Sequence, residues 1–371
     1  MEDPPRLLAG KEVRQGVLLI RAGGGGALDY SITLIPGDGI GPEVSEAAAR
    51  VVAGAGVRVS WERVQAGSAA LEAGSPTPLP ADVLDSIQRT RVALKGPVTT
   101  PVGSGFPSVN VALRQALDLY ASVRPVRTLP GVASRHDGVN LVIVRENTEG
   151  LYAGREHEVV PGVVETLRIV SRRASERIAR FAFELARREE RRRVTVAHKA
   201  SVLKLSDGLF LSCAAQVSAD FPFIRTEDMS IDEAALQLVL EPSRFQVLLT
   251  ENLFGDVLSD LCAGLVGGLG VVPGANIGDR HAVFEAVHGS APDIAGRGIA
   301  NPTALILSAA MMLDHIGEHR AAGAIRAAVE SVLADGRQVT PDLGGKAGTR
   351  EMTDAVLAAM VGPVPSAGAR A

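Results

Sequence analysis

The sequence has very little cysteine and no long apolar run. Cys213 and Cys262 are the only cysteines in 371 residues, too few for a disulfide framework or a cysteine zinc site. They fit a reducing compartment, and we expect a cytoplasmic location. No apolar run approaches the length of a membrane span, and a net charge of -4 at pH 7 argues against nucleic-acid binding as the primary role. We therefore expect neither a membrane nor a nucleic acid as partner.

The composition and the patterning predict a globular α/β protein. Hydrophobic residues make up 46% and charged residues 22%, and the length is enough for two domains or one large unit. Strand-like segments such as Tyr30–Ile35 alternate with helical ones such as Glu43–Val52, which is typical of the α/β class. Residues 1–29 are expected to be a flexible N-terminal extension and residues 363–371 a loose tail.

A glycine turn follows the first predicted strand. The segment Pro36-Gly37-Asp38-Gly39-Ile40-Gly41-Pro42 is similar to a dinucleotide-binding fingerprint, and Glu62 stands about where a ribose-binding acid would. Pro42, however, occupies the place of the third glycine. We therefore predict a tight strand-to-helix turn rather than a Rossmann site.

Two acidic residues share one face of a predicted helix. The segment from Asn252 has the apolar period of a helix, and Asp256 and Asp260 are one turn apart. Their charges could face solvent near a helix N-terminus, where the macrodipole tolerates them. Alternatively, a divalent cation held by oxygen ligands would convert their repulsion into attraction. The glycines that follow and the flanking apolar residues leave little of this helix looking like an open surface, but the segment by itself leaves both alternatives open.

Basic residues stand at predicted strand ends. Arg124 and Arg145 lie at or near the ends of two strand-like segments, and Lys199 closely follows the strand Val194–Ala197. Ligands bind beside strand carboxyl ends in open α/β sheets, which makes these cations candidates for ligand binding.

Several other polar residues allow two interpretations each. Ser108 or Asn110 could cap the helix that carries Arg114, which lies four residues after Asn110 on the same face. Asn301 could cap the helix that begins at Pro302, and Asp232 could be an ordinary first-turn acid. The small residues of the segment 288–296 would let backbone approach a phosphate.

Six segments together resemble the β-decarboxylating dehydrogenases of the isocitrate/isopropylmalate dehydrogenase family. In chain order they read I-P-G-D-G-I-G-P-E, K-G-P-V-T-T-P, D-L-Y-A-S-V-R-P, R-E-N-T-E-G-L-Y, N-L-F-G-D-V-L-S-D-L and H-G-S-A-P-D-I-A-G with its N-P-T. The resemblance implies the two-domain α/β fold of that family, which is not a Rossmann fold. Residues 30–119 and 267–362 would form a discontinuous, cofactor-binding large domain, and residues 120–266 a small domain with the dimer interface and an arm.

The resemblance also implies a set of site residues. The catalytic pair would be Tyr152 and Lys199. The substrate would be bound by Ser108, Asn110, Arg114, Arg124 and Arg145. The metal, Mg2+ or Mn2+, would be held by Asp232, Asp256 and Asp260. The cofactor would contact Thr99, His288, Gly289, Ser290, Ala291, Pro292, Asp293, Ile294 and Asn301. In this family one subunit of a dimer lends a lysine and an aspartate to the other's site, here Lys199 and Asp232, so we expect a homodimer or a higher assembly.

The resemblance implies NAD-dependent oxidative decarboxylation of isocitrate to 2-oxoglutarate. Isocitrate dehydrogenases carry a serine and an asparagine where this sequence has Ser108 and Asn110, and both suit the third carboxylate of a tricarboxylate substrate. NAD-linked relatives carry an aspartate and an aliphatic residue where this sequence has Asp293 and Ile294, although Asp293 could simply turn the loop. Homoisocitrate, 3-isopropylmalate and tartrate are the alternative substrates within the family. A non-catalytic regulatory subunit is the alternative from another class, but the acid-base and metal residues are present.

Overall fold

The computed structural model describes residues 11–14, 17–21, 28–99 and 108–361. The expected tail at 363–371 lies outside the described residues, and so does much of the expected extension at 1–29.

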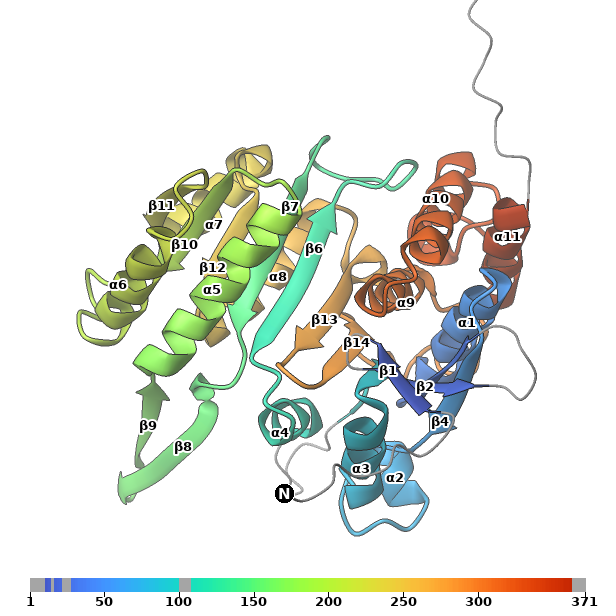
Figure 1. Cartoon of the computed structure of the whole chain (residues 1–371), viewed down its shortest axis with the longest axis horizontal. Helices are drawn as coiled ribbons and strands as arrows, with labels where there is room; N and C mark the ends of the chain where they lie inside the picture. The colour runs from blue at the N-terminus through green and yellow to red at the C-terminus, as the bar shows by residue number, and fades with distance from the viewer. Residues whose placement is uncertain (1–10, 15–16, 22–27, 100–107, 362–371) are drawn as a thin grey trace, which may run out of the picture.

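One mixed sheet of twelve strands runs through the molecule, with helices on its faces (Figure 1). Its order is β1-β2-β3-β5-β14-β13-β6-β7-β12-β10-β11, with β4 paired to β3, and β8 and β9 form a separate hairpin. The strands are β1 (Lys11–Arg14), β2 (Val17–Arg21), β3 (Leu28–Ile35), β4 (Val59–Arg63), β5 (Val92–Lys95), β6 (Ala121–Arg127), β7 (Asn140–Glu146), β8 (Gly150–Val160), β9 (Val163–Ile169), β10 (Arg193–His198), β11 (Arg225–Ser230), β12 (Val247–Thr250), β13 (Pro273–Ile277) and β14 (Ala282–Ala286).

The helices pack apolar faces against this sheet and against each other. Short 3-10 turns occur at Pro242–Arg244, Leu269–Val271 and Pro341–Leu343. The α-helices are α1 (Gly41–Gly54), α2 (Ser68–Glu72), α3 (Ala81–Thr90), α4 (Val109–Ala116), α5 (Arg172–Arg188), α6 (Ser206–Ser218), α7 (Ile231–Leu240), α8 (Asn252–Leu265), α9 (Thr303–His315), α10 (His319–Asp335) and α11 (Thr349–Val361).

The strand directions confirm the predicted non-Rossmann α/β fold. Strands β3, β5 and β14 are parallel, as are β7, β12, β10 and β11, but β13 and β6 join the two groups through antiparallel pairings. A Rossmann sheet is mostly parallel and places its ligand where the strand order reverses. Here the antiparallel junction brings the ends of strands from distant parts of the chain together.

The segment after β3 is a tight turn into α1, as predicted, and its glycines allow close packing. A Cβ atom on Gly37 would stand 2.1 Å from the carbonyl oxygen of Pro97, and one on Gly39 would stand 2.0 Å from that of Ser290. Both glycines also have positive φ angles, 82° and 59°. The turn is thus packed against two other loops. Glu62 is likewise structural, because it accepts hydrogen bonds from Ser31, Ser86 and Arg89.

Part of the expected flexible extension forms strands. β1 pairs antiparallel with β2, and β2 pairs antiparallel with the first residues of β3. The start of β3 extends beyond its pairing with β5, so its backbone groups on that side have room for another strand. The division into a large and a small domain stays a prediction.

None of the helices in the described ranges is both long and apolar enough to cross a membrane.

Candidate active site

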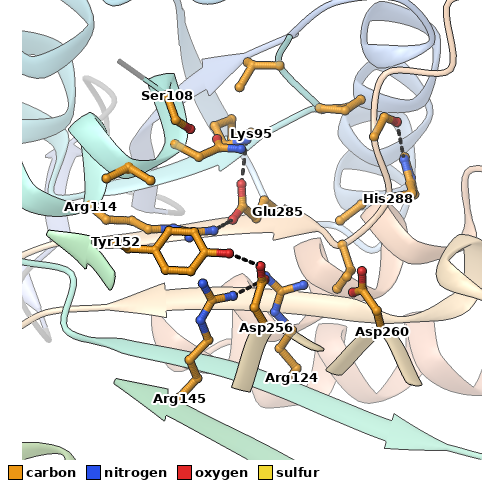
Figure 2. A pocket seen from close by; sticks show the side chains of 17 residues that line it. Lys95, Ser108, Arg114, Arg124, Arg145, Tyr152, Asp256, Asp260, Glu285 and His288 are labelled. Atoms are coloured by element: carbon orange, nitrogen blue, oxygen red, sulfur yellow. Dashed lines mark hydrogen bonds and ion pairs between the residues drawn. The ribbon is translucent and has the colours of Figure 1, made fainter. Parts of the chain in front are cut away.

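A polar cavity of about 250 Å³ opens where the ends of β5, β7 and β14 and the middle of β6 meet α4 and α8 (Figure 2). The structure brings most of the predicted substrate, metal and acid-base residues together there. The predicted residues that line it are Ser108, Asn110, Arg114, Arg124, Arg145, Tyr152, Asp256, Asp260, His288 and Gly289.

Helix α8 presents the two acidic residues to this cavity. Glu251 caps the helix by accepting the backbone N–H of Phe254 at 2.8 Å, and Leu258 and Cys262 bury the opposite side. Asp256 and Asp260 therefore project toward the cavity rather than only into bulk solvent, although Asp260 remains exposed. This placement favours the ligand-binding interpretation of the pair over the solvated one.

Asp256 is held between a guanidinium and a phenol. Arg145 is ion-paired with one of its oxygens, and the hydroxyl of Tyr152 donates to the other (Figure 2). Arg145 is oriented by Asn252, whose side-chain oxygen accepts from Nε at 2.9 Å and from Nη2 at 2.6 Å. Gly255 makes this approach possible, because a Cβ there would stand 2.6 Å from Cγ of Arg145.

The two carboxyl groups differ in acidity. Burial acts to raise the pKa of Asp256, but Arg145, Tyr152 and Arg124 outweigh it and lower that pKa overall. The pKa of Asp260 is raised, chiefly by burial, although Arg124 opposes this. Burial and then the bond to Asp256 raise the pKa of the Tyr152 phenol, which stays protonated near neutral pH. A protonated phenol in this position can serve as a proton donor.

A buried ion-pair cluster that the sequence reasoning missed forms one wall. Glu285 lies 2.5 Å from Nζ of Lys95 and 3.3 Å from Arg114, and it accepts from Asn276 at 2.7 Å. Burial acts to raise the pKa of Glu285, but Lys95 and Arg114 lower it strongly overall. The signal in the sequence was a charged residue in each of two short apolar strands, because such residues are rarely buried unless paired.

Two polar atoms in the cavity wall lack partners. Asn110 Oδ1 and Arg114 Nε are buried and have no hydrogen-bond partner among the described residues. The side chain of Ser108, which could have been only a helix cap, makes no capping hydrogen bond to α4. Because unsatisfied buried polar groups are costly, these atoms are suited to a polar ligand.

The remaining arginine is also buried against the cavity. Burial, followed by repulsion from Arg114 and Arg145, lowers the pKa of Arg124 to about 10, so the guanidinium stays charged at neutral pH. The pKa of His288 is lowered, again chiefly by burial, which keeps its imidazole neutral. The cavity thus holds four cations, at Lys95, Arg114, Arg124 and Arg145, against three carboxylates.

A second cavity of about 510 Å³ shares His288 and Gly289 with the first. Ile40, Ala291, Ile294 and Ile299 make it largely apolar, while Asn301 and Asp342 add polar groups. Asn301 donates to Asp342 at 2.9 Å and also accepts from the N–H of Thr303, so it both starts α9 and faces the cavity. Sequence reasoning assigned no role to Asp342.

The loop that borders this cavity is held by the glycine turn. The backbone N–H of Ile40 donates to the carbonyl oxygen of Ser290 at 2.9 Å, and the hydroxyls of Thr99 and Ser290 are 2.6 Å apart. Ala291 has a φ of 38°, an uncommon conformation for a residue with a side chain. Of the predicted cofactor residues, Thr99, Ser290, Pro292 and Asp293 do not line the cavity, and Asp293 is exposed.

Lys199 and Asp232 lie elsewhere in the chain. They form an ion pair with each other after β10 and at the start of α7, and neither lines the first cavity. Within the described part of the chain, no three His, Cys, Asp or Glu side chains are grouped so that they could hold a metal ion. Asp256 and Asp260 offer the hard oxygen donors that Mg2+ or Mn2+ prefers, which suits a site completed by water, substrate or another chain.

Comparison with known proteins shows a similarity that covers nearly the whole chain. The isocitrate/isopropylmalate dehydrogenase family model matches residues 31–356. The chain belongs to this family. As a family member, it carries the fold and the enzyme class that the motifs implied, and the family implies NAD and a divalent metal as cofactors.

Three relatives define the likeness. The mitochondrial NAD isocitrate dehydrogenase catalytic subunit 5 of Arabidopsis thaliana is 49% identical, over 87% of this chain and 87% of its own length. A mitochondrial NAD isocitrate dehydrogenase regulatory subunit of Dictyostelium discoideum is 47% identical, over 88% and 90%. The crystal structure of isocitrate dehydrogenase from Methylococcus capsulatus is 53% identical, with a TM-score of 0.86, over 89% of this chain and 99% of that chain.

The comparison corrects the expected location. The curated relatives are mitochondrial by name, which contradicts the cytoplasmic expectation for this family member. Two buried cysteines exclude a disulfide-built protein, but they do not distinguish one reducing compartment from another. The relatives are also named as catalytic and regulatory subunits, which indicates assembly from several chains without supporting a homodimer in particular.

Proposed function

We propose that the protein is an NAD-dependent isocitrate dehydrogenase that oxidises isocitrate and releases CO2 to give 2-oxoglutarate. Two kinds of support converge on this activity. The chain is similar over most of its length to NAD isocitrate dehydrogenase subunits. Its polar cavity gathers the acid, the arginines and the carboxylates that such a reaction needs.

The charge of the cavity is the observation that supports a tricarboxylate substrate, the class to which isocitrate and homoisocitrate both belong. Four cations against three carboxylates leave one net positive charge, and a divalent cation at Asp256 and Asp260 would raise this to three. A tricarboxylate carries three negative charges at neutral pH, so it would be neutralised, whereas a dicarboxylate would leave positive charge unpaired. At the edge of the same cavity, the Ser108 hydroxyl can donate to a carboxylate, and the unpaired Asn110 Oδ1 can accept from a substrate hydroxyl.

Each cofactor has a place in this proposal. When bound, NAD accepts the hydride from the substrate, and the divalent cation supplies positive charge beside the reacting hydroxyl. Asp256 and Asp260 would hold the metal. His288, Gly289, Ala291, Ile294 and Asn301 would hold the adenosine half of NAD in the second cavity, and the shared His288 and Gly289 connect it to the substrate.

The proton transfers fall to Tyr152 and Lys199. Tyr152 faces the cavity with a raised pKa, so it can deliver a proton to the enol formed when CO2 leaves. Arg114, Arg124 and Arg145 would orient the substrate carboxylates through paired hydrogen bonds. Lys199, contributed by a second chain, would take the hydroxyl proton.

The positions of Lys199 and Asp232 support our proposal of a site shared between chains. Both are outside the cavity of their own chain, and they pair with each other on its surface. The hairpin of β8 and β9 exposes Val160, Val164 and Leu167, as an arm that packs on another chain would. We propose a homodimer as the minimal unit. We also propose that each chain divides into a large domain of residues 30–119 and 267–362 and a small domain of residues 120–266.

The test is an assay of the purified chain alone with NAD and Mn2+. Isocitrate, homoisocitrate, 3-isopropylmalate and tartrate are compared side by side, and reduction of NAD with isocitrate is expected to have the highest kcat/KM. A higher kcat/KM with any of the other three would overturn the substrate assignment.

A second candidate is a regulatory subunit, because a relative named as one is 47% identical to this chain. The two functions differ in one result. A regulatory subunit would show no turnover alone but would raise the activity of a catalytic partner. Turnover by the isolated chain would exclude this role as its sole function.

A further inference from the structure

A third cavity, of about 790 Å³, lies on the face of the sheet that Figure 1 looks onto. β6 and β13 form its floor, α5 one wall, and α9 and α10 the other. We call it the α5–α9 cleft and define it by Val123, Ala275, Phe181, Arg188, Met311 and His315. Its volume lies within the range of about 300–1,000 Å³ that small-molecule sites occupy.

The α5–α9 cleft is separate from the candidate active site although the same strands form both. Side chains along a strand alternate between faces. Arg124 faces the active-site cavity, whereas its neighbour Val123 lines the α5–α9 cleft. In β14, Glu285 faces the active-site cavity and Phe284 lines the cleft. One layer of backbone therefore divides the two cavities.

The interior of the cleft is apolar and aromatic. Phe181 from α5, Phe284 from β14 and Met311 from α9 converge on it, with Ile277 at the end of β13. The ring of His315 packs on Phe284 with 5.5 Å between ring centroids. Burial, and then Arg188, lowers the pKa of His315, so its imidazole is neutral at neutral pH. Such walls suit an apolar or aromatic body.

The mouth of the cleft carries excess positive charge. The arginines that line it are Arg127, Arg188, Arg191 and Arg326, and the acidic residues that line it are Glu189 and Asp314. Arg191 pairs with Glu189 and Arg326 with Asp314, while Arg127 pairs with Glu330 outside the cleft. Arg188, at the end of α5, is exposed and has no hydrogen-bond or ion-pair partner among the described residues. A cation is thus available at the edge of an apolar cavity.

We propose that the α5–α9 cleft binds a small amphipathic anion, with an apolar or aromatic body between α5 and α9 and an acidic group at Arg188. The cleft is distinct from the proposed sites for substrate and NAD. Binding of the anion there requires neither substrate nor NAD. The apolar body would cover Phe181, Phe284 and Met311, and the acidic group would form an ion pair with the Arg188 guanidinium.

The experiment uses 8-anilinonaphthalene-1-sulfonate, an aromatic sulfonate whose fluorescence reports an apolar environment, with the full chain. Saturable binding of one dye per chain and displacement by decanoate are expected. Isocitrate should not displace the dye, because its site is on the other face of the strands. Displacement by isocitrate, or no saturable binding, would overturn the proposal.

Two variants test whether the dye binds in the α5–α9 cleft. Arg188→Glu is expected to raise its Kd about tenfold, as the loss of one charged contact typically does. Met311→Trp should remove saturable binding by filling the apolar interior. Arg173→Glu, an exposed charge reversal at the other end of α5, is the matched control and should leave the Kd unchanged. An unchanged thermal unfolding midpoint verifies the fold of each variant. Equal Kd values for Arg188→Glu and Arg173→Glu, or binding that persists in Met311→Trp, would refute the site.

Discussion

Lys95 and Glu285 are register partners on the adjacent parallel strands β5 and β14, and their charged atoms lie 2.5 Å apart. Both side chains are almost completely buried, at the wall of the candidate active site. Arg114 adds a second cation at 3.3 Å. The pair therefore joins β5 to β14 at the wall of the substrate cavity.

We expect Lys95→Met to destabilise the protein by about 3–5 kcal/mol, because it leaves a buried carboxylate short of its main partner. The measurement is urea unfolding at fixed protein concentration. Arg337→Met, which breaks the exposed pair with Asp335, is the control and should leave the free energy of unfolding nearly unchanged, because solvent screens such a pair. If Lys95→Met lowers the free energy of unfolding no more than the control does, Arg114 and Asn276 are enough to stabilise the buried Glu285 carboxylate.

The same pair predicts a dependence of stability on pH. The pKa of Glu285 is lowered in the folded state, so its contribution is complete above the unfolded pKa of about 4.3 and is lost as pH falls below it. The free energy of unfolding should therefore fall more steeply below that pH in the native chain than in Lys95→Met. Parallel curves for the two proteins would contradict this.

Asp256→Asn should reduce kcat/KM for isocitrate at least about 100-fold and weaken the response to Mn2+, because positive charge from a bound cation is worth several kcal/mol in such reactions. Activity is titrated with Mn2+ in both proteins. Asp335→Asn, an exposed change at the end of α10, is the control. Near-native activity of Asp256→Asn at low Mn2+ would place the metal elsewhere.

The double change Ser108→Leu with Asn110→Leu should impair isocitrate far more than 3-isopropylmalate. Losing the polar partners of a buried carboxylate costs about 1–3 kcal/mol or more, and an aliphatic wall suits the apolar substrate better. The ratio of the two kcat/KM values measures the effect. Equal losses for both substrates would show that this edge of the cavity does not discriminate.

Mixed subunits test the shared site. Lys199→Met and Tyr152→Phe chains should each be inactive alone and regain some activity together after exchange, because a mixed assembly contains one site with both native residues. Exchange is followed with differently tagged chains, and remixed native chains are the control. No recovery despite exchange would put Lys199 and Tyr152 of one site in one chain.

Asp293→Lys combined with Ile294→Tyr should shift the preference from NAD toward NADP. A carboxylate near the adenosine ribose can accept hydrogen bonds from its hydroxyls, but it would repel a 2′-phosphate of about two negative charges. The measurement is kcat/KM for both cofactors in the native and doubly changed chains. A native preference for NADP, or an unmoved ratio, would refute the role of Asp293, which is exposed and outside the second cavity.

Local chemistry was sufficient for much of the site. The spacing of Asp256 and Asp260 is a property of any α-helix, so the sequence alone placed both carboxylates on one face of α8. The tertiary structure turned that face toward the cavity. The segment after β3 was also recognisable as a tight strand-to-helix turn rather than a Rossmann site, since Pro42 broke the dinucleotide pattern. The motifs, read as a resemblance, supplied the family and the alternation of strands and helices supplied the α/β class.

Tertiary structure decided what depends on long-range pairing. Nothing local indicated that Lys95 would meet Glu285, because the two are register partners only once β5 and β14, far apart in the chain, become neighbours. The α5–α9 cleft likewise exists only because antiparallel β13 and β6 join two groups of parallel strands and separate the helices on one face. A sequence determines which side chains alternate along each strand, but the order of the strands determines which of them meet.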